Sequence, residues 1–225
     1  MIRYLIEPFI LLQTACKAAL FSWKEERKVK KNYYNNPRFK QQDQALKKEW
    51  RWINPYAESR RFLARKGESE IHTYGETPLT VFALIAERLR LKKEDLFLDL
   101  GCGRGRGVFF LQTYFGCKAY GVDWVPSFIH KARSVARSTC CSAGFELGPI
   151  HESKFIEQAQ VIYLAWTCIE EEERAEVEQA LVRVLPGTQV ITISYPLQSQ
   201  DFTLSFTSCV SFPWGEAEIF FHVKH

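Results

Sequence analysis

Residues Leu96–Gly107 read LFLDLGCGRGRG, an apolar run followed by four glycines within seven residues. A buried strand that ends in a glycine-rich turn and passes into a helix is typical of the first unit of an open α/β sheet. In such sheets, ligands bind at the carboxyl ends of the strands. Glycine lets the backbone adopt unusual conformations, and it removes each Cβ that would clash with a ligand lying against the chain. The stretch therefore predicts a fold class and the position of a binding site.

From Thr77 onward, strand-like apolar runs alternate with segments of helical periodicity. This alternation predicts an α/β fold with a mostly parallel sheet and helices on both faces. The last two strands are joined by Pro213-Trp214-Gly215, which is too short for a crossover helix, so they must pair antiparallel. The seven expected strands are 96–100, 118–123, 144–150, 161–166, 188–196, 202–212 and 216–223.

Helix start and stop signals lie between these strands. Thr77 followed by Pro78 predicts an N-cap and a first-turn proline. A second helix is expected to open inside the glycine loop, and a third to follow Pro126. A fourth is expected to begin at the four glutamates of residues 170–173 and to end at Pro186-Gly187.

The charges divide the chain in two, because residues 1–66 hold 16 Lys and Arg against 6 Asp and Glu, and the remainder holds 14 against 20. We expect a basic helical extension over 1–66 and an α/β domain over 67–225. Aromatic side chains in the extension, at Trp50, Trp52, Tyr56 and Phe62, favour helical docking. The basic charge fits contact with nucleic acid, an acidic protein or an anionic membrane, and it equally fits a solvated helix face.

Residues 1–22 are apolar, but their longest uncharged run covers only residues 8–16, too short to span a bilayer. Two interpretations stay open for residues 1–31. The segment packs on the body or on an acidic partner, or it lies at a membrane surface with the basic residues of 24–31 toward the headgroups. None of the seven cysteines forms a Cys-x-x-Cys pair, so we expect a reducing, cytoplasmic location and no metal site.

Two cofactor classes compete for the glycine loop. A dinucleotide needs Gly-x-Gly-x-x-Gly, and the third position is Arg106 when the pattern starts at Gly101 and Val108 when it starts at Gly103. The spacing present is acid-x-Gly-x-Gly-x-Gly, formed by Asp99, Gly101, Gly103 and Gly105. This pattern resembles motif I of the class I S-adenosylmethionine-dependent methyltransferases, whose Rossmann-like sheet has seven strands and an antiparallel C-terminal hairpin. The resemblance implies S-adenosyl-L-methionine as the cofactor, with its amino-acid part against the glycines.

Asp123 ends the second expected strand, 24 residues after Asp99. In the resembled family, a carboxylate here accepts both ribose hydroxyls, and the next residue, Trp124, packs on adenine. After the third strand, where the resembled family often has an acid for the adenine amine, the chain has Gly148-Pro149-Ile150. We expect that contact to come from the backbone of Ile150 or from Glu152. Asp123 has a second interpretation as a helix cap, and Trp124 has one as ordinary core.

The run HTYGETPLT, residues 72–80, resembles the loop that precedes the core in two groups of enzymes: the non-SET histone lysine methyltransferases and the lysine methyltransferases of mitochondrial ATP synthase. The resemblance implies that Tyr74, Glu76 and Thr77 lie near the methionine end of the cofactor. We expect Tyr74 and Trp166 to act at the reacting centre by lining, with Tyr195, an aromatic channel that favours an uncharged amine.

After the fourth strand the chain reads Ala165-Trp166-Thr167, where the histone enzymes carry an asparagine. It also lacks the Asn/Asp-Pro-Pro-Tyr/Phe motif, which disfavours methylation of nucleic-acid bases. Holding an acceptor in line with an activated methyl group can supply about 7–11 kcal/mol of the barrier. We therefore expect methyl transfer to a protein side chain, most simply lysine. A small-molecule methyltransferase and a non-catalytic S-adenosylmethionine-binding module are the alternatives.

Overall fold

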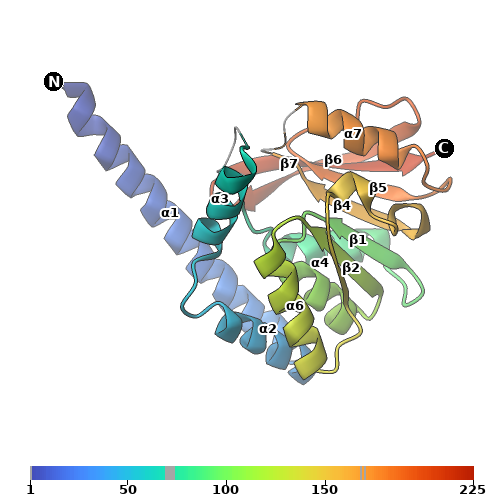
Figure 1. The fold of residues 1–225 in the computed structure, drawn as a ribbon, viewed down its shortest axis with the longest axis horizontal. Coiled ribbons are helices and arrows are strands. Elements are labelled where there is room, and N and C mark those ends of the chain that lie inside the picture. The colour runs from blue at the N-terminus through green and yellow to red at the C-terminus, as the bar shows by residue number, and fades with distance from the viewer. Residues whose placement is uncertain (1, 69–73, 168, 170) are drawn as a thin grey trace.

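The computed structural model describes residues 2–68, 74–167, 169 and 171–225. Its centre is a seven-stranded sheet in the order β3-β2-β1-β4-β5-β7-β6 (Figure 1). The first five strands pair parallel, and β7 runs antiparallel to both β5 and β6. The predicted mixed sheet is therefore confirmed. The strands are β1 (Leu96–Leu100), β2 (Lys118–Asp123), β3 (Gly144–Leu147), β4 (Val161–Ala165), β5 (Gln189–Ile193), β6 (Phe202–Phe212) and β7 (Gly215–Lys224).

The central strands are buried because helices cover both faces of the sheet. Side chains of β1 alternate between two cores: Phe97 joins one, and Leu96, Leu98 and Leu100 join the other. The first core packs against α4 (Leu79–Leu89), α5 (Arg106–Phe110) and α6 (Pro126–Ser138). The second packs against α7 (Glu171–Leu181) and two short 3-10 turns, Ile150–Glu152 and Ile156–Gln158. The helix expected inside the glycine loop is α5, which continues as a π-helical turn over Leu111–Phe115.

The start of α4 differs from the prediction. Its N-cap position is Pro78, which makes no side-chain cap hydrogen bond, and the Thr77 hydroxyl bonds instead to Tyr163 Oη at 2.7 Å. The cap comes from a distant helix: the Glu25 carboxylate accepts hydrogen bonds from Thr80 N at 3.1 Å and Thr80 Oγ1 at 3.0 Å. A tertiary contact thus satisfies the exposed amide that a local threonine was expected to satisfy.

Residues before the sheet form α1 (Ile2–Tyr33), α2 (Pro37–Glu49) and α3 (Pro55–Lys66). Asn36 and Asn54 cap α2 and α3, and each is followed by a proline at the first helical position. Figure 1 shows the N-terminal part of α1 leading away from the body, while its C-terminal part runs along the helical layer. Val29 of this part is fully buried.

Three of the four aromatic residues expected to dock do so. Trp50 is 5% exposed and packs on Phe128, while Tyr56 and Phe62 make edge contacts with Tyr74 and Trp124. The prediction was wrong for Trp52, which is 85% exposed because it lies in the turn between α2 and α3.

Within the described chain, we find no helix that combines the length and the hydropathy needed to cross a bilayer. The division at residue 66 and the contact of residues 1–31 with a membrane or an acidic partner stay predictions. The hydrophobic core itself continues across the division, since Phe39, Leu46 and Trp50 belong to the same cluster as Phe97.

Candidate active site

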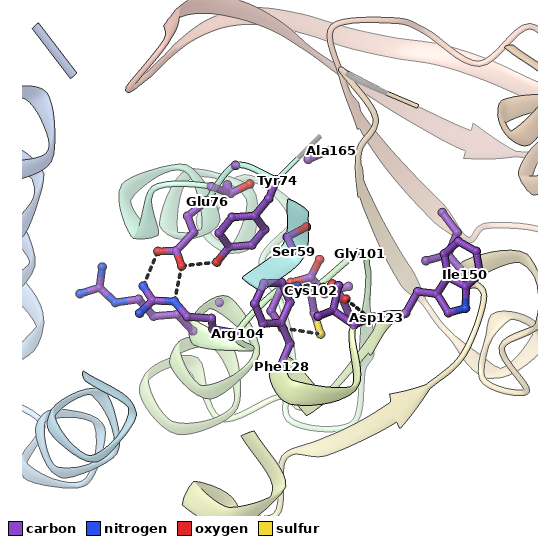
Figure 2. A pocket seen from close by; sticks show the side chains of 18 of the residues that line it. Ser59, Tyr74, Glu76, Gly101, Cys102, Arg104, Asp123, Phe128, Ile150 and Ala165 are labelled. Carbon is purple, nitrogen blue, oxygen red and sulfur yellow. Dashed lines mark hydrogen bonds and ion pairs between the residues drawn. The ribbon is translucent and has the colours of Figure 1, made fainter. Parts of the chain in front are cut away.

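A pocket lies at the carboxyl ends of β1, β2 and β4, where the sheet order reverses on either side of β1. Figure 2 shows Tyr74, Glu76 and Arg104 on one side of it and Ile150 on the other, with Gly101 and Asp123 between them. Nine of the predicted cofactor residues line this pocket: Tyr74, Glu76, Thr77, Asp99, Gly101, Gly103, Asp123, Trp124 and Ile150. Of the resembling loop, His72 and Thr73 lie outside the described residues.

The glycines of the loop serve different ends. Gly101, Gly103 and Gly105 all have positive φ, at 89°, 53° and 79°. A Cβ added at Gly101 would meet no protein atom within 4 Å, so the space beside it is open to a ligand. A Cβ at Gly103 would lie 2.9 Å from the Tyr74 ring.

The prediction that Gly105 contacts the cofactor is wrong, because Gly105 is not among the residues that line the pocket. A Cβ at this position would lie 2.3 Å from the ring of Phe145 on β3. Its missing side chain lets the start of α5 approach the sheet, which is a packing requirement and not a cofactor contact.

Asp123 is 8% exposed and already holds the loop. Its Oδ2 accepts a hydrogen bond from Gly103 N, and its Oδ1 accepts one from Val125 N, both at 2.8 Å. The second bond closes a turn just before α6, whose N-cap residue is Val125 and which has no side-chain cap, so the helix-capping interpretation of Asp123 is wrong. Each carboxylate oxygen has two lone-pair sites, so both keep one acceptor position.

Asp99 lies 3% exposed on the neighbouring strand and also lines the pocket. Burial raises the pKa of Asp99 to about 8, and the nearby charge of Asp123 adds to the rise. Burial likewise raises the pKa of Asp123 to about 7, against the lowering effect of the backbone donors at Val125, Gly103 and Trp124. A cation bound here would favour the ionised form of both groups.

Residues 74–78 form a loop over the pocket, the pocket loop, which is tied to the glycine loop through Glu76. Arg104 donates to both oxygens of Glu76, from Nη2 at 2.7 Å and from Nε, and the Tyr74 hydroxyl donates to the same carboxylate. Burial opposes ionisation of Glu76, but the charge and hydrogen bonds of Arg104 lower its pKa overall. The Tyr74 pKa is raised well above its ordinary value, first by burial and then by the Glu76 charge, so Tyr74 stays a neutral donor.

S-adenosyl-L-methionine fits these residues. Asp123 retains acceptor positions for two sugar hydroxyls, Gly101 offers open backbone, and Trp124 and Ile150 give apolar surface at the same end of the pocket. The adjacent carboxylates suit the cationic sulfonium and amino groups of this molecule.

The prediction that Trp166 and Tyr195 line an aromatic channel at the reacting centre is wrong. Its side chain is fully buried in the core that packs against α7, and its indole Nε1 donates to the Tyr195 carbonyl at 2.9 Å. Neither Trp166 nor Tyr195 lines the pocket, and the Tyr195 ring is 47% exposed beneath Arg174. Side chains of a strand alternate between faces, and position 166 turns toward the core.

Sequence reasoning missed several lining residues. Ser59, Leu63 and Glu68 come from α3 and the residues that follow it, far from the glycine loop along the chain. Arg104 and Arg106 lie within the glycine-rich stretch 101–107. Their position between glycines could have indicated that they line the same site. Tyr163 gave none, since it reads as an ordinary residue of a buried strand.

The comparisons with known proteins agree with this geometry. The family described as "Histone methylation protein DOT1" matches residues 57–212, which include the pocket loop, the glycine loop and Asp123. Phosphoethanolamine N-methyltransferase 1 of Arabidopsis thaliana is 27% identical over 111 residues, covering 48% of this chain. That match spans only 23% of the plant protein's length.

Solved structures share the fold. An RNA methyltransferase from Salinibacter ruber in complex with S-adenosyl-L-homocysteine has a TM-score of 0.55 at 20% identity, over 66% of this chain and 93% of that one. Magnesium protoporphyrin IX methyltransferase from Synechocystis, also with bound S-adenosyl-L-homocysteine, has a TM-score of 0.52 at 15% identity, over 65% and 81%. The chain therefore carries a class I S-adenosylmethionine-dependent methyltransferase domain and belongs to the DOT1 histone methylation protein family.

Proposed function

We propose that this enzyme transfers a methyl group from S-adenosyl-L-methionine to the side-chain amine of a lysine in a protein. The observation that carries the proposal is the charge of the pocket. Its described acidic lining residues are Glu68, Glu76, Asp99, Asp123 and Glu173. Its cations, Arg104 and Arg106, are both ion-paired with carboxylates. Glu76 is neutralised by Arg104, and the carboxyl groups that remain favour an amine over an anionic acceptor.

The bound cofactor supplies an activated methyl group on a sulfonium, so the protein has to position the acceptor and exclude water. Thr77 and Tyr163 join the pocket loop to β4 through their hydroxyls, and Arg104 joins it to the glycine loop through Glu76, to which Tyr74 also donates. These contacts hold the loop from both sides. The Tyr163 pKa is raised by burial, so its hydroxyl, like that of Tyr74, stays protonated.

A lysine must lose a proton before it attacks. Removal from water disfavours the charged ammonium, and the Tyr74 and Phe128 rings, with centroids 4.8 Å apart, give the pocket an apolar wall. The proposal is supported further by the DOT1 family match, which spans all of these residues.

A small-molecule amine is the second candidate, because the plant relative is named for the N-methylation of phosphoethanolamine. A phosphate group needs a cation or several free backbone amides. The pairing of Arg104 with Glu76, and of Arg106 with Asp43 and Glu26, counts against a phosphate-bearing acceptor. Methylation of nucleic-acid bases is disfavoured, because the chain has Ala165-Trp166-Thr167 after β4 where the base methyltransferases have the Asn/Asp-Pro-Pro-Tyr/Phe motif.

The test is to incubate the purified protein with S-adenosylmethionine carrying a tritiated methyl group and a lysate of the source cells. Label in methyl-lysine after acid hydrolysis of the protein fraction supports the proposal. Label confined to small amines supports the second candidate. Cofactor binding in calorimetry without any transfer would instead indicate a non-catalytic binding module. D123A is the negative control, and E49Q, a surface substitution on α2, is the matched positive control.

A further inference from the structure

The two arginines of the GRGRG segment anchor the glycine loop to different parts of the molecule. Arg104 reaches Glu76 in the pocket loop, as described above and drawn in Figure 2. Arg106, the first residue of α5, reaches in another direction, toward α1 and α2. Both side chains also line the pocket, so both act at its edge.

Arg106 is held by carboxylates of two helices that precede the sheet. Its Nε donates to Asp43 Oδ1 at 2.7 Å, and its Nη2 donates to Asp43 Oδ2 at 3.0 Å and to Glu26 Oε2 at 2.9 Å. Lys47 Nζ, 2.7 Å from Asp43 Oδ2, and the Tyr34 hydroxyl donate to the same group of carboxylates. Arg106 and Lys47 thus balance the charges of Asp43 and Glu26, and the exposed Lys30 lies 3.9 Å from Glu26 Oε1.

This cluster is largely shielded from solvent. The Asp43 side chain is fully buried, and that of Arg106 is 19% exposed. Burial alone would raise the pKa of Asp43, but hydrogen bonds and charge from Arg106, together with Lys47, lower it well below its ordinary value. Paired charges with satisfied hydrogen bonds at such a site are sensitive to the loss of one partner.

The loop needs such an anchor. Three of its residues have positive φ, which leaves the backbone without the local preference that side chains would impose. Arg106 directly follows Gly105, and Gly103 N is the donor to Asp123, the predicted ribose-binding carboxylate. The position of the Arg106 side chain therefore bears on the position of the cofactor-binding backbone two to five residues earlier.

We propose that Asp43 is a positioning residue of the cofactor site. It fixes Arg106, and through Arg106 it fixes the glycine loop in the conformation that accepts the cofactor. The inference rests on the proposed use of S-adenosylmethionine. It makes α2 a structural part of the cofactor site, although the Asp43 carboxylate does not line the pocket.

The experiment compares D43N with E49Q by calorimetric binding of S-adenosylmethionine, with amide hydrogen exchange as a second readout. An asparagine has the shape of Asp43 but only one accepting atom, so it cannot satisfy both prongs of the Arg106 fork. Glu49 lies on the same helix, where it pairs with Lys131 at 3.7 Å and is 41% exposed. Both variants remove one negative charge from α2, and only D43N touches the Arg106 cluster.

For D43N we expect the Kd to rise about tenfold, equivalent to about 1.4 kcal/mol, with E49Q within about twofold of the parent. Amides of residues 101–107 should exchange faster in D43N, while those of β4 stay unchanged. R106K, which keeps the charge but loses the planar fork, should weaken binding by a smaller factor than D43N.

An unchanged Kd in D43N would overturn the proposal. So would faster exchange in β4 as well as in the loop, or failure of D43N to fold, because each shows a role in global stability and not in loop position. If the parent protein itself binds no S-adenosylmethionine, the proposed function fails, and the two failures are thereby distinguished.

Discussion

Glu25 on α1 caps α4 through two hydrogen bonds to Thr80, although 55 residues separate the two positions. Glu25 is 7% exposed, and the N-terminus of α4 has no side-chain cap of its own. E25A should lower the free energy of unfolding by about 1–2 kcal/mol, since it leaves the partly buried amide of Thr80 without its partner. Urea denaturation measures the loss. T80V, which removes only the hydroxyl, should cost less, and equal stability of E25A and the parent protein would contradict this account.

Asp123 should carry much of the cofactor affinity. D123A removes acceptors for two hydroxyls, each worth about 1.5–3 kcal/mol when the acceptor is charged, so we expect the Kd for S-adenosylmethionine to rise by at least about 100-fold. Calorimetry is the measurement. D201N serves as the control, because Asp201 pairs with Lys224 at 3.0 Å away from the pocket. If D123A and D201N bound S-adenosylmethionine with comparable Kd values, Asp123 would not be a cofactor-binding residue.

Binding and stability should respond to pH in opposite directions. The folded-state pKa values of Asp99, about 8, and Asp123, about 7, both lie above the ordinary value of 3.8. The folded state therefore binds more protons than the unfolded state between about pH 4 and pH 8, and the free energy of unfolding contributed by these groups falls as pH rises through that range. A cationic cofactor favours the ionised carboxylates, so its affinity should rise from pH 6 to pH 9 with release of protons.

Calorimetry in buffers of different ionisation enthalpy measures that proton release. D99N should flatten the dependence of affinity on pH. An affinity that falls as pH rises would show that the carboxyls are not coupled to the cofactor.

Two glycines of one loop should give different defects when changed to alanine. G105A places a Cβ 2.3 Å from Phe145, so we expect a loss of stability of about 1–3 kcal/mol. G101A meets no protein atom, and beyond the cost of its positive φ it should act on cofactor binding. Denaturation and calorimetry on both variants separate the effects. If one of the two variants were the more impaired in both stability and cofactor binding, the two glycines would not have the separate roles described here.

Trp166 should prove structural. W166F keeps an aromatic ring in the core but removes one of the two donors to the Tyr195 carbonyl, the other being the Thr192 hydroxyl at 2.7 Å. The lost hydrogen bond should cost about 0.5–1.5 kcal/mol. The Kd for S-adenosylmethionine should stay within about twofold of the parent, which calorimetry checks. A large loss of affinity for S-adenosylmethionine in a folded W166F protein would show that Trp166 takes part in cofactor binding.

The fold and the part of the pocket formed by the strand ends and the glycine loop could be predicted because their signals are local. Asp99 and Asp123 each follow from a strand that ends at the ligand edge, and the hairpin of β6 and β7 follows from the short turn between them. Thr77 shows the limit of such reasoning. It has the residue type of an N-cap, yet its hydroxyl pairs with Tyr163, and the cap is supplied by Glu25.

The sequence by itself determined the sheet and the glycine loop, because apolar periodicity and glycine spacing are properties of short segments, and the resemblance of that loop to motif I implied the cofactor class. Only the tertiary structure decided which side chains complete the site. Arg104 and Arg106 find their carboxylates on Glu76 and Asp43, 28 and 63 residues away. Contacts between such distant positions depend on how the helices pack, and no local pattern records that packing.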